Sequence, residues 1–327
     1  MNATKPGKPT ARPATGATKR AGKMAGSDAA GSEQELAVAG AIHLLALQAI
    51  STWRRWAPGD LTFQGGTSLH LAFGSTRYSE DLDFLIRPDA AKDLPGLAGR
   101  CAQQVREGLM RFYPDAKVDI SLGKDESNPR LFWIGMTSSR FARKVKVKVE
   151  FFATQYAQQY RSSLRPVSAR DANVSRLVST ASLLPVATLD EVLLDKVHAI
   201  AMRSYAKARD FYDVWYLSTQ GITEPQGETW IAGLNRHAQM YGHELPELLE
   251  RFGQRLDAAR EPATRERMIV DLQQWLPHVD ELFLAGCLDD AHAVLDNVRE
   301  AVEHELSQDS EDCPDDEPGA SFDVPRG

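Results

Sequence analysis

The chain has 327 residues, of which 43% are hydrophobic and 25% charged, an ordinary balance for a soluble globular protein with one or two buried cores. No apolar run approaches the roughly 20 residues of a membrane span, and the basic N-terminus lacks the apolar segment of a secretory signal. The formal net charge of −7 does not exclude a nucleic-acid partner, because nine acidic residues and one arginine follow from Glu303 and leave the rest of the chain close to neutral.

The two ends of the chain differ in composition from its middle. Residues 1–31 are basic, rich in Pro, Ala, Gly and Thr, and nearly free of large apolar side chains, so we expect them to be disordered. Residues 307–327 form an acidic tail that we also expect to be disordered. Between them, a Ser-x-x-Glu capping box that starts at Ser32 predicts a helix to about Trp56.

The next stretch has the features of a phosphate-binding turn. A short apolar strand over residues 61–63 leads into a Gly-Gly pair, which permits a tight turn and a close approach of a ligand to the backbone. Thr67 and Ser68 then open a helical segment, and free N–H groups at such a position bind phosphate. We therefore expect Gly65, Gly66, Thr67 and Ser68 to cradle the phosphates of a nucleotide.

Two aspartates follow on the next predicted strand. Asp81 and Asp83 are two residues apart, so their side chains share one face of the strand while Leu82 and Phe84 share the other. Paired carboxylates can hold Mg²⁺ ions roughly 3.5–4 Å apart, which clamp the attacking and leaving oxygens of a transfer reaction. A surface Asp pair is the simpler interpretation, but the preceding turn favours metal-assisted nucleotidyl transfer.

A third informative strand lies at residues 143–152. Lysines at 144, 146 and 148 and a terminal Glu150 share one face, while Val and Phe alternate with them on the other. A solvated edge strand guarded by lysines would account for the lysines but not for the glutamate. The lysines, Lys148 among them, are candidates for contacts with nucleic-acid phosphates.

The second half of the chain is predominantly helical. Residues 155–187 look like a loop-rich crossing segment, and we place a domain boundary near residue 186. Helices are predicted over 189–201, 207–216, 227–241, 245–258, 262–276 and 289–306. The Lys and Arg residues of the last helices face either RNA or solvent. Cys101, Cys287 and Cys313 are far apart, which argues against disulfides or structural zinc and favours a reducing cytoplasm.

Two of these helices carry candidate phosphate-binding cations. A triphosphate needs cations beyond its metal ions, and Lys196 supplies a point charge while Arg209 supplies a fork suited to phosphate or carboxylate. Asp210 and Asp213 would orient those cations or a substrate hydroxyl. The alternative is an ordinary salt-bridge cluster between two helices.

Four of these motifs resemble those of the AbiEii/AbiGii toxin nucleotidyltransferases, members of the polymerase-β-like superfamily and toxin halves of bacterial toxin–antitoxin and phage-abortive systems. The resemblance spans about residues 60–217. The chain departs from the family motif at Glu191, where the motif begins with Gln, and this weakens any role for that position. The matching segments are Gly65-Gly66-Thr67, Arg77-Tyr78-Ser79-Glu80-Asp81-Leu82-Asp83-Phe84, Asp195-Lys196 with Ala201 after four further residues, and Arg209-Asp210-x-x-Asp213.

The resemblance implies an α/β (α+β) fold that is divided into two domains. A nucleotidyltransferase domain with a small mixed sheet would occupy residues 32–186, and a helical C-terminal domain would occupy residues 187–306, with the active cleft between them. Glu150, in Lys148-Val149-Glu150, would supply the third acidic residue beside the Asp pair.

The implied reaction is attack by an acceptor hydroxyl on the α-phosphorus of a nucleoside triphosphate (NTP), with release of pyrophosphate. Asp81, Asp83 and Glu150 would hold two Mg²⁺ ions, and Arg77 and Lys196 would neutralise the β- and γ-phosphates. The resemblance further implies a growth-inhibiting toxin that adds nucleotides to tRNA 3′ ends and is balanced by a cognate antitoxin protein.

Three other functions remain open on the sequence. A transferase acting on a small molecule, of the antibiotic-modifying type, would use the same turn and carboxylates, and so would one that modifies proteins. A protein that acts only by binding a partner would need a degraded metal site, and the presence of all three carboxylates disfavours that alternative.

Overall fold

The computed structural model describes residues 33–124, 127–276 and 278–311. The predicted tail of residues 1–31, the first residue of the predicted capping box and the end of the acidic tail lie outside these ranges. Strands and helices alternate through the first part of the chain and helices alone follow, so the predicted α/β class is confirmed.

A seven-stranded mixed sheet forms the first half of the molecule, with strand order β3-β4-β5-β2-β1-β7-β6. The strand β2 lies near the centre, antiparallel to β1 and parallel to β5. β5 is therefore an interior strand, and its lysines do not guard an edge. The strands are β1 (Leu61–Gln64), β2 (Asp81–Ile86), β3 (Lys117–Leu122), β4 (Arg130–Thr137), β5 (Val145–Ala153), β6 (Ser162–Val167) and β7 (Ser182–Ala187).

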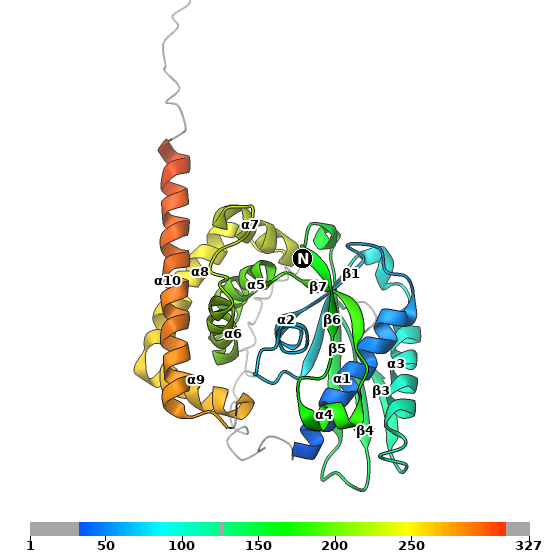
Figure 1. Cartoon of the computed structure of the whole chain (residues 1–327). Coiled ribbons are helices and arrows are strands. Elements are labelled where there is room, and N and C mark those ends of the chain that lie inside the picture. Colours follow the sequence, from blue (N-terminus) through cyan, green and yellow to red (C-terminus); the bar gives the residue numbers. More distant parts are fainter. Residues whose placement is uncertain (1–32, 125–126, 277, 312–327) are drawn as a thin grey trace, which may run out of the picture.

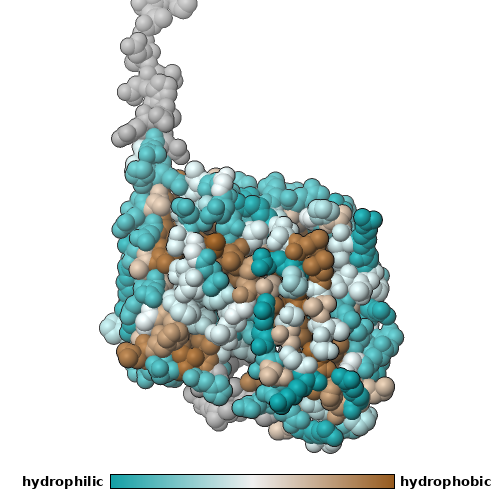
Figure 2. All heavy atoms as spheres, in the orientation of Figure 1, coloured by the Kyte–Doolittle hydropathy of each residue, from teal (hydrophilic) through white to brown (hydrophobic). Residues whose placement is uncertain are grey.

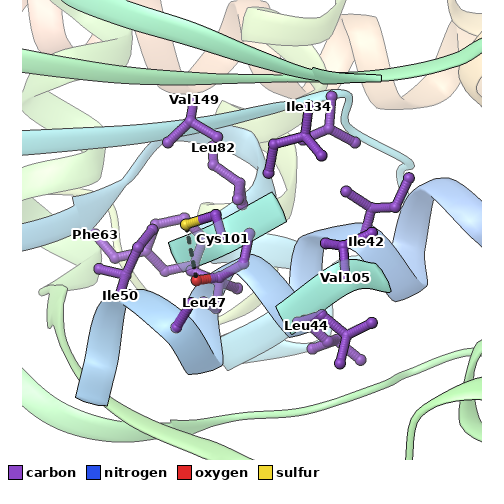
Figure 3. Close-up of a cluster of buried hydrophobic side chains, with 14 of the residues drawn as sticks. Ile42, Leu44, Leu47, Ile50, Phe63, Leu82, Cys101, Val105, Ile134 and Val149 are labelled. Carbon is purple, nitrogen blue, oxygen red and sulfur yellow. Dashed lines mark hydrogen bonds between the residues drawn. The ribbon is translucent and has the colours of Figure 1, made fainter. Parts of the chain in front are cut away.

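One face of the sheet is covered by the helices α1 (Glu33–Trp53), α3 (Leu94–Leu109) and α4 (Ala172–Leu177) (Figure 1). Figure 3 shows Leu47 and Val105 of these helices packed toward Leu82 and Val149 of the sheet. Among the described residues, α1 is the one helix long and apolar enough to cross a membrane, yet most of it is buried in this core. A helix that is apolar on all sides is expected in such a position.

The other face of the sheet meets the helical half of the chain. Strand alternation turns Leu85 of β2 and Phe152 of β5 toward this half, where they join a second cluster of buried apolar side chains. The helices are α5 (Leu189–Met202), α6 (Ala208–Thr219), α7 (Trp230–Tyr241), α8 (Leu245–Arg260), α9 (Pro262–Trp275) and α10 (Glu281–Glu311). The two clusters divide the chain near residue 186, and the predicted division into two domains stays a prediction.

Two segments differ from the sequence interpretation. The prediction of a loop-rich segment over residues 155–187 was wrong, because β6, α4 and β7 lie there. Pro166 and Pro185 hid these strands, since proline is rarely found inside a strand. The helix α10 also continues through the first residues of the predicted acidic tail, as far as Glu311. Its far end projects beyond the rest of the molecule and has a hydrophilic surface (Figures 1 and 2).

Short helical turns complete the connection between the first two strands. The four-residue helix α2 (Gly65–Ser68) follows β1 directly and runs into the π-helix η1 (Leu69–Phe73). Gly74, with a φ of 91°, ends this segment. Two 3₁₀ turns, η2 (Pro88–Ala91) and η3 (Gln155–Gln158), follow β2 and β5.

Candidate functional site

The three predicted carboxylates lie on two neighbouring strands. In the parallel pairing of β2 with β5, Asp83 is opposite Glu150 and Asp81 is opposite Lys148. The Nζ atom of Lys148 is 2.9 Å from Oδ2 of Asp81 and 3.2 Å from Oε2 of Glu150. The lysine ammonium group thus lies between two carboxylates, on the face of the sheet that meets the helical half.

Negative charge is concentrated at this point. Burial raises the pKa of the Asp83 carboxyl to about 7, and the charges of Asp81 and Glu150 and a hydrogen bond with Glu150 add to the rise. Lys148 opposes this shift only in part. Burial acts to lower the pKa of Lys148 itself, but the hydrogen bond and charge of Asp81 outweigh it and raise that pKa. The cluster therefore favours a bound cation.

The Gly-Gly turn packs against charged side chains of the site. Gly65 has a φ of 78°, and a Cβ atom there would lie 2.7 Å from Oδ2 of Asp83. A Cβ atom on Gly66 would lie 2.2 Å from Nη2 of Arg77. Both positions therefore require glycine, Gly65 for its backbone conformation and both for lack of space.

The hydroxyl groups of the turn are directed inward. Thr67 Oγ1 donates a hydrogen bond to the carbonyl oxygen of Asp81, and Ser68 Oγ donates one of 2.8 Å to the carbonyl oxygen of Gly65. Both residues are buried. The Thr67 hydroxyl fastens the turn to β2 and the Ser68 hydroxyl bonds within the turn, so in this conformation the groups of the turn that remain for an anion are backbone N–H groups.

Two of the predicted phosphate-binding cations, Arg77 and Lys196, are joined in a buried array. Arg77 Nε and Nη2 each donate a hydrogen bond of 2.9 Å to Asp213, and Lys196 Nζ lies 2.7 Å from Asp213 and 3.1 Å from Asp210. Arg203 also pairs with Asp210. Burial acts to raise the pKa of Asp213, but Arg77 and Lys196 outweigh it and lower that pKa. The salt-bridge cluster considered from the sequence is therefore present for Lys196.

A cavity of about 340 Å³ brings part of the predicted site together. Asp83 and Glu150 line it from the sheet and Gly65 from the turn, while Lys196 lines it from α5 and Arg203 from the residue that follows α5. Arg77 and Asp213 are fully buried behind Lys196. Arg209 lines a different and larger cavity, so the structure does not place it with the carboxylates.

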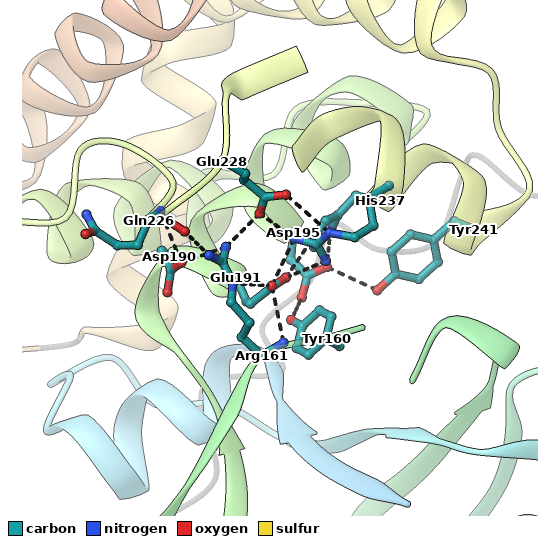
Figure 4. Close-up of polar contacts among 10 residues, drawn as sticks. Tyr160, Arg161, Asp190, Glu191, Asp195, Gln226, Glu228, His237 and Tyr241 are labelled. Carbon is teal, nitrogen blue, oxygen red and sulfur yellow. Dashed lines mark hydrogen bonds and ion pairs between the residues drawn. The ribbon is translucent and has the colours of Figure 1, made fainter. Parts of the chain in front are cut away.

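A polar network that the sequence did not predict holds α5 in place (Figure 4). Glu191 is completely buried and accepts hydrogen bonds from Arg161, Arg236 and His237. The other ring nitrogen of His237, Nδ1, lies 3.0 Å from Asp195, the neighbour of Lys196. Glu191 thus has a structural role, although its departure from the family motif had suggested little importance. Its partners are about 30 and 46 residues away in sequence, so no local pattern could reveal them.

The carboxylates have the right donor chemistry for a hard divalent cation, since Mg²⁺ prefers oxygen ligands. In the described part of the chain, however, no three His, Cys, Asp or Glu side chains are grouped so that they could hold a metal ion. Lys148 lies between two of the carboxylates instead. Asp83 and Glu150 face a common cavity, and the raised pKa of Asp83 fits a site that a cation completes.

Comparisons with known proteins bear on both family and fold. The family model described as nucleotidyl transferase AbiEii toxin, type IV TA system, matches residues 56–304. No curated protein sequence matches the chain. A Helicobacter pylori protein described as a candidate nucleotidyltransferase is similar in structure, with 16% identity, a TM-score of 0.51, and coverage of 84% of this chain and 98% of its own. MenT4, a nucleotidyltransferase toxin from Mycobacterium tuberculosis H37Rv, has 16% identity, a TM-score of 0.50, and coverage of 81% and 95%.

Proposed function

The chain belongs to the AbiEii family of nucleotidyl transferase toxins of type IV toxin–antitoxin systems, and on this basis we propose that it transfers nucleotides from an NTP to RNA in the cytoplasm. The acceptor in this proposal is the 3′ end of tRNA. The observation that carries the proposal is the cavity in which Asp83 and Glu150 face Lys196 beside Gly65. A cognate antitoxin protein is the expected partner.

In the proposed reaction, the oxygen of an acceptor hydroxyl forms a bond to the α-phosphorus of the NTP. The bond from that phosphorus to its bridging oxygen breaks, pyrophosphate leaves with the bonding electrons, and the proton of the acceptor hydroxyl passes to solvent. Asp81, Asp83 and Glu150 would hold two Mg²⁺ ions. When bound, these ions would stabilise charge on the attacking and leaving oxygens.

Lys148 has a distinct part in this proposal. It neutralises Asp81 and Glu150 through contacts of 2.9 and 3.2 Å. A divalent cation and the lysine compete for the same carboxylate oxygens, so Lys148 would give up these contacts when the site is loaded. Its ammonium group then becomes available to phosphate oxygens.

The triphosphate would be bound by the Gly-Gly turn and by Lys196. The backbone N–H groups of Gly65 and Gly66 would supply donors, while Thr67 holds the turn against β2 and Ser68 bonds within the turn. Lys196 lines the cavity and supplies the positive charge. Asp210 and Asp213 keep Lys196 in position, and Arg77 in turn pairs with Asp213.

The deciding experiment offers several acceptors to the protein at once. The purified chain is incubated with Mg²⁺, one labelled NTP at a time, and total RNA, a protein extract or small-molecule acceptors. We expect label on RNA of tRNA size, no label after chelation of the metal, and none with Asp83→Asn. Label only on protein or small molecules would overturn the RNA acceptor, and label on no acceptor with any NTP would overturn the transferase activity.

A further inference from the structure

A second and larger cavity, of about 510 Å³, lies between the start of α6 and the helices α8 and α9. We call it the α6–α9 cavity. Its volume is typical of a small-molecule or nucleotide site. Its charged lining consists of Lys207, Arg209, Arg255 and Arg267 against the single carboxylate of Asp271.

The cations of this cavity differ from their neighbours in lacking acidic partners. Other arginines of the same helices are paired, such as Arg251 with Glu247 and Arg265 with Asp289. Within the described ranges, none of the four cavity cations lies within 4 Å of a carboxylate oxygen. Burial and the nearby positive charges of Arg203 and Arg209 lower the pKa of Lys207. The cavity therefore has an excess of positive charge that suits an anion.

Aromatic rings lie directly beside these cations. Tyr205 is 61% exposed, and the Nζ atom of Lys207 lies 5.8 Å from its ring centre. The guanidinium carbon of Arg209 lies 5.7 Å from the ring centre of Trp275, which also lines the cavity. Inorganic phosphate would use the cations alone, whereas a nucleotide residue also offers a base that can stack on an aromatic ring.

The α6–α9 cavity and the smaller cavity that contains Asp83 and Glu150 are lined by neighbouring residues of the chain. The link between α5 and α6 connects the two cavities, because Arg203 lines the smaller one and Tyr205 and Lys207 line the larger one. A strand bound in the α6–α9 cavity therefore lies beside the proposed catalytic site.

We propose that the α6–α9 cavity binds the single-stranded end of the RNA acceptor. A base stacks on Tyr205 or Trp275, and phosphodiester groups pair with Lys207, Arg255 and Arg267. This inference rests on the proposed function, which it deepens by assigning a place to the acceptor. Single-stranded binding sites of other proteins combine the same two elements, a basic groove and stacking rings.

The test measures binding without turnover. Fluorescence anisotropy of a labelled single-stranded oligoribonucleotide is recorded with the full chain in the presence of a chelator, so that binding is measured apart from catalysis. Arg255→Glu should raise the Kd by about tenfold or more and reduce its dependence on salt concentration. Arg251→Glu is the matched control, since it makes the same charge change on the same helix at a residue paired with Glu247, and it should leave the Kd nearly unchanged.

A second pair of variants tests the stacking. Tyr205→Ala should weaken binding by roughly fivefold or more, while Tyr205→Phe, which keeps the ring, should not. Equal effects of Arg255→Glu and Arg251→Glu would overturn the proposal. The proposal would also be overturned by a second pair of results, if an equally charged acidic peptide displaced the oligoribonucleotide fully and Tyr205→Ala had no effect on binding.

Turnover measurements separate the two substrates. In the RNA-labelling assay, Arg255→Glu should raise the KM for RNA and leave the KM for NTP unchanged. If only the KM for NTP rose, the cavity would be assigned to the nucleotide and the inference would be overturned. A wild-type chain that labels no acceptor overturns the proposed function instead. The anisotropy measurement then still decides whether the cavity binds single-stranded RNA.

Discussion

Arg77 and Asp213 form a two-pronged ion pair, with both hydrogen bonds at 2.9 Å, between the loop that precedes β2 and a helix of the second half of the chain. Both side chains are almost completely shielded from solvent. Breaking such a pair leaves an uncompensated buried charge. The geometry of the candidate site thus depends on a contact between residues 136 positions apart.

The first prediction concerns this ion pair. Arg77→Ala should lower the free energy of unfolding by about 3–5 kcal/mol, because Asp213 loses both hydrogen bonds and keeps only Lys196. Urea unfolding followed by circular dichroism measures this loss. Arg87→Ala is the control, because Arg87 pairs with Asp60 but is 39% exposed, and it should cost less than about 1 kcal/mol. Similar losses in the two variants would contradict the prediction.

The second prediction separates chemistry from folding at Asp83. The pKa of this carboxyl is about 7 in the folded chain, above its ordinary value of 3.8. Ionisation therefore destabilises the folded state as the pH rises from about 4 through 7, when metal is absent. Asp83→Asn removes this effect, so with a chelator at pH 8 its melting temperature should equal or exceed that of the wild type. Its nucleotide transfer should fall by several orders of magnitude, and near-normal turnover would rule out the metal-site assignment.

The third prediction concerns competition between Lys148 and a divalent cation. Lys148→Ala removes the positive charge between Asp81 and Glu150, so Mg²⁺ or Mn²⁺ should raise the melting temperature of this variant more than that of the wild type. Thermal melting with and without metal measures the difference. Lys146→Ala, an exposed lysine on the same strand, should respond like the wild type. Identical metal-induced shifts in all three proteins would show that Lys148 does not compete with the ion.

The fourth prediction concerns Lys196. Lys196→Ala removes a cation from the cavity but leaves Asp213 paired with Arg77 and Asp210 paired with Arg203. The variant should fold, lose about 1–3 kcal/mol of stability, and show a raised KM for NTP while metal binding is retained. Steady-state kinetics and the metal-dependent melting shift are the two measurements. An unchanged KM would leave Lys196 with a structural role only.

The fifth prediction uses the buried histidine of the Figure 4 network. Burial acts to lower the pKa of His237, but the charge of Asp195 outweighs it and the pKa lies above its ordinary 6.5. The stabilisation from the protonated ring is fully present below pH 6.5 and is lost as the pH rises through the folded-state pKa. Unfolding free energies at pH 6 and pH 9 should therefore differ more in the wild type than in His237→Gln. Equal differences would contradict a charged His237.

The stabilisation that Glu191 contributes to the same network depends on pH in the opposite direction. Burial acts to raise the pKa of Glu191, but hydrogen bonds from His237 and Arg236 outweigh it and lower the pKa to about 2, below the ordinary 4.5. Its stabilisation is present above pH 4.5 and is lost as the pH falls toward 2. Glu191→Gln should accordingly flatten the acid limb of the stability profile between these two values.

Local patterns in the sequence predicted the parts of the site that depend on one strand or one turn. Alternation placed Asp81 and Asp83 on one face of β2 and Glu150 on the polar face of β5, and the Gly-Gly pair predicted a tight turn. Because the pairing register of two strands is a long-range property, the sequence could not show that Lys148 would lie opposite Asp81. The family and the α/β class were likewise accessible, since several motifs occur in a fixed order.

Other features depend on contacts that no local pattern encodes. The hydroxyls of Thr67 and Ser68 were expected to face a phosphate, yet they bond backbone carbonyls because the turn is buried beneath β2. Arg209 was grouped with Lys196 by motif, but the helix α6 turns its side chain into the larger cavity. Trp275 lies half-exposed beside Arg209, a position that helical periodicity could not reveal.

The packing of the Gly-Gly turn has a genetic consequence. Every missense change in a glycine codon adds a Cβ atom, and at positions 65 and 66 that atom would push on Asp83 and on the tethered guanidinium of Arg77. Every amino-acid replacement at codons 65 and 66 should therefore disturb the packing of the turn. When the chain is expressed without its antitoxin, colonies that escape growth arrest through single missense mutations should carry changes at these two codons more often than at Gly253 or Gly286, where an added Cβ atom meets nothing within 4 Å.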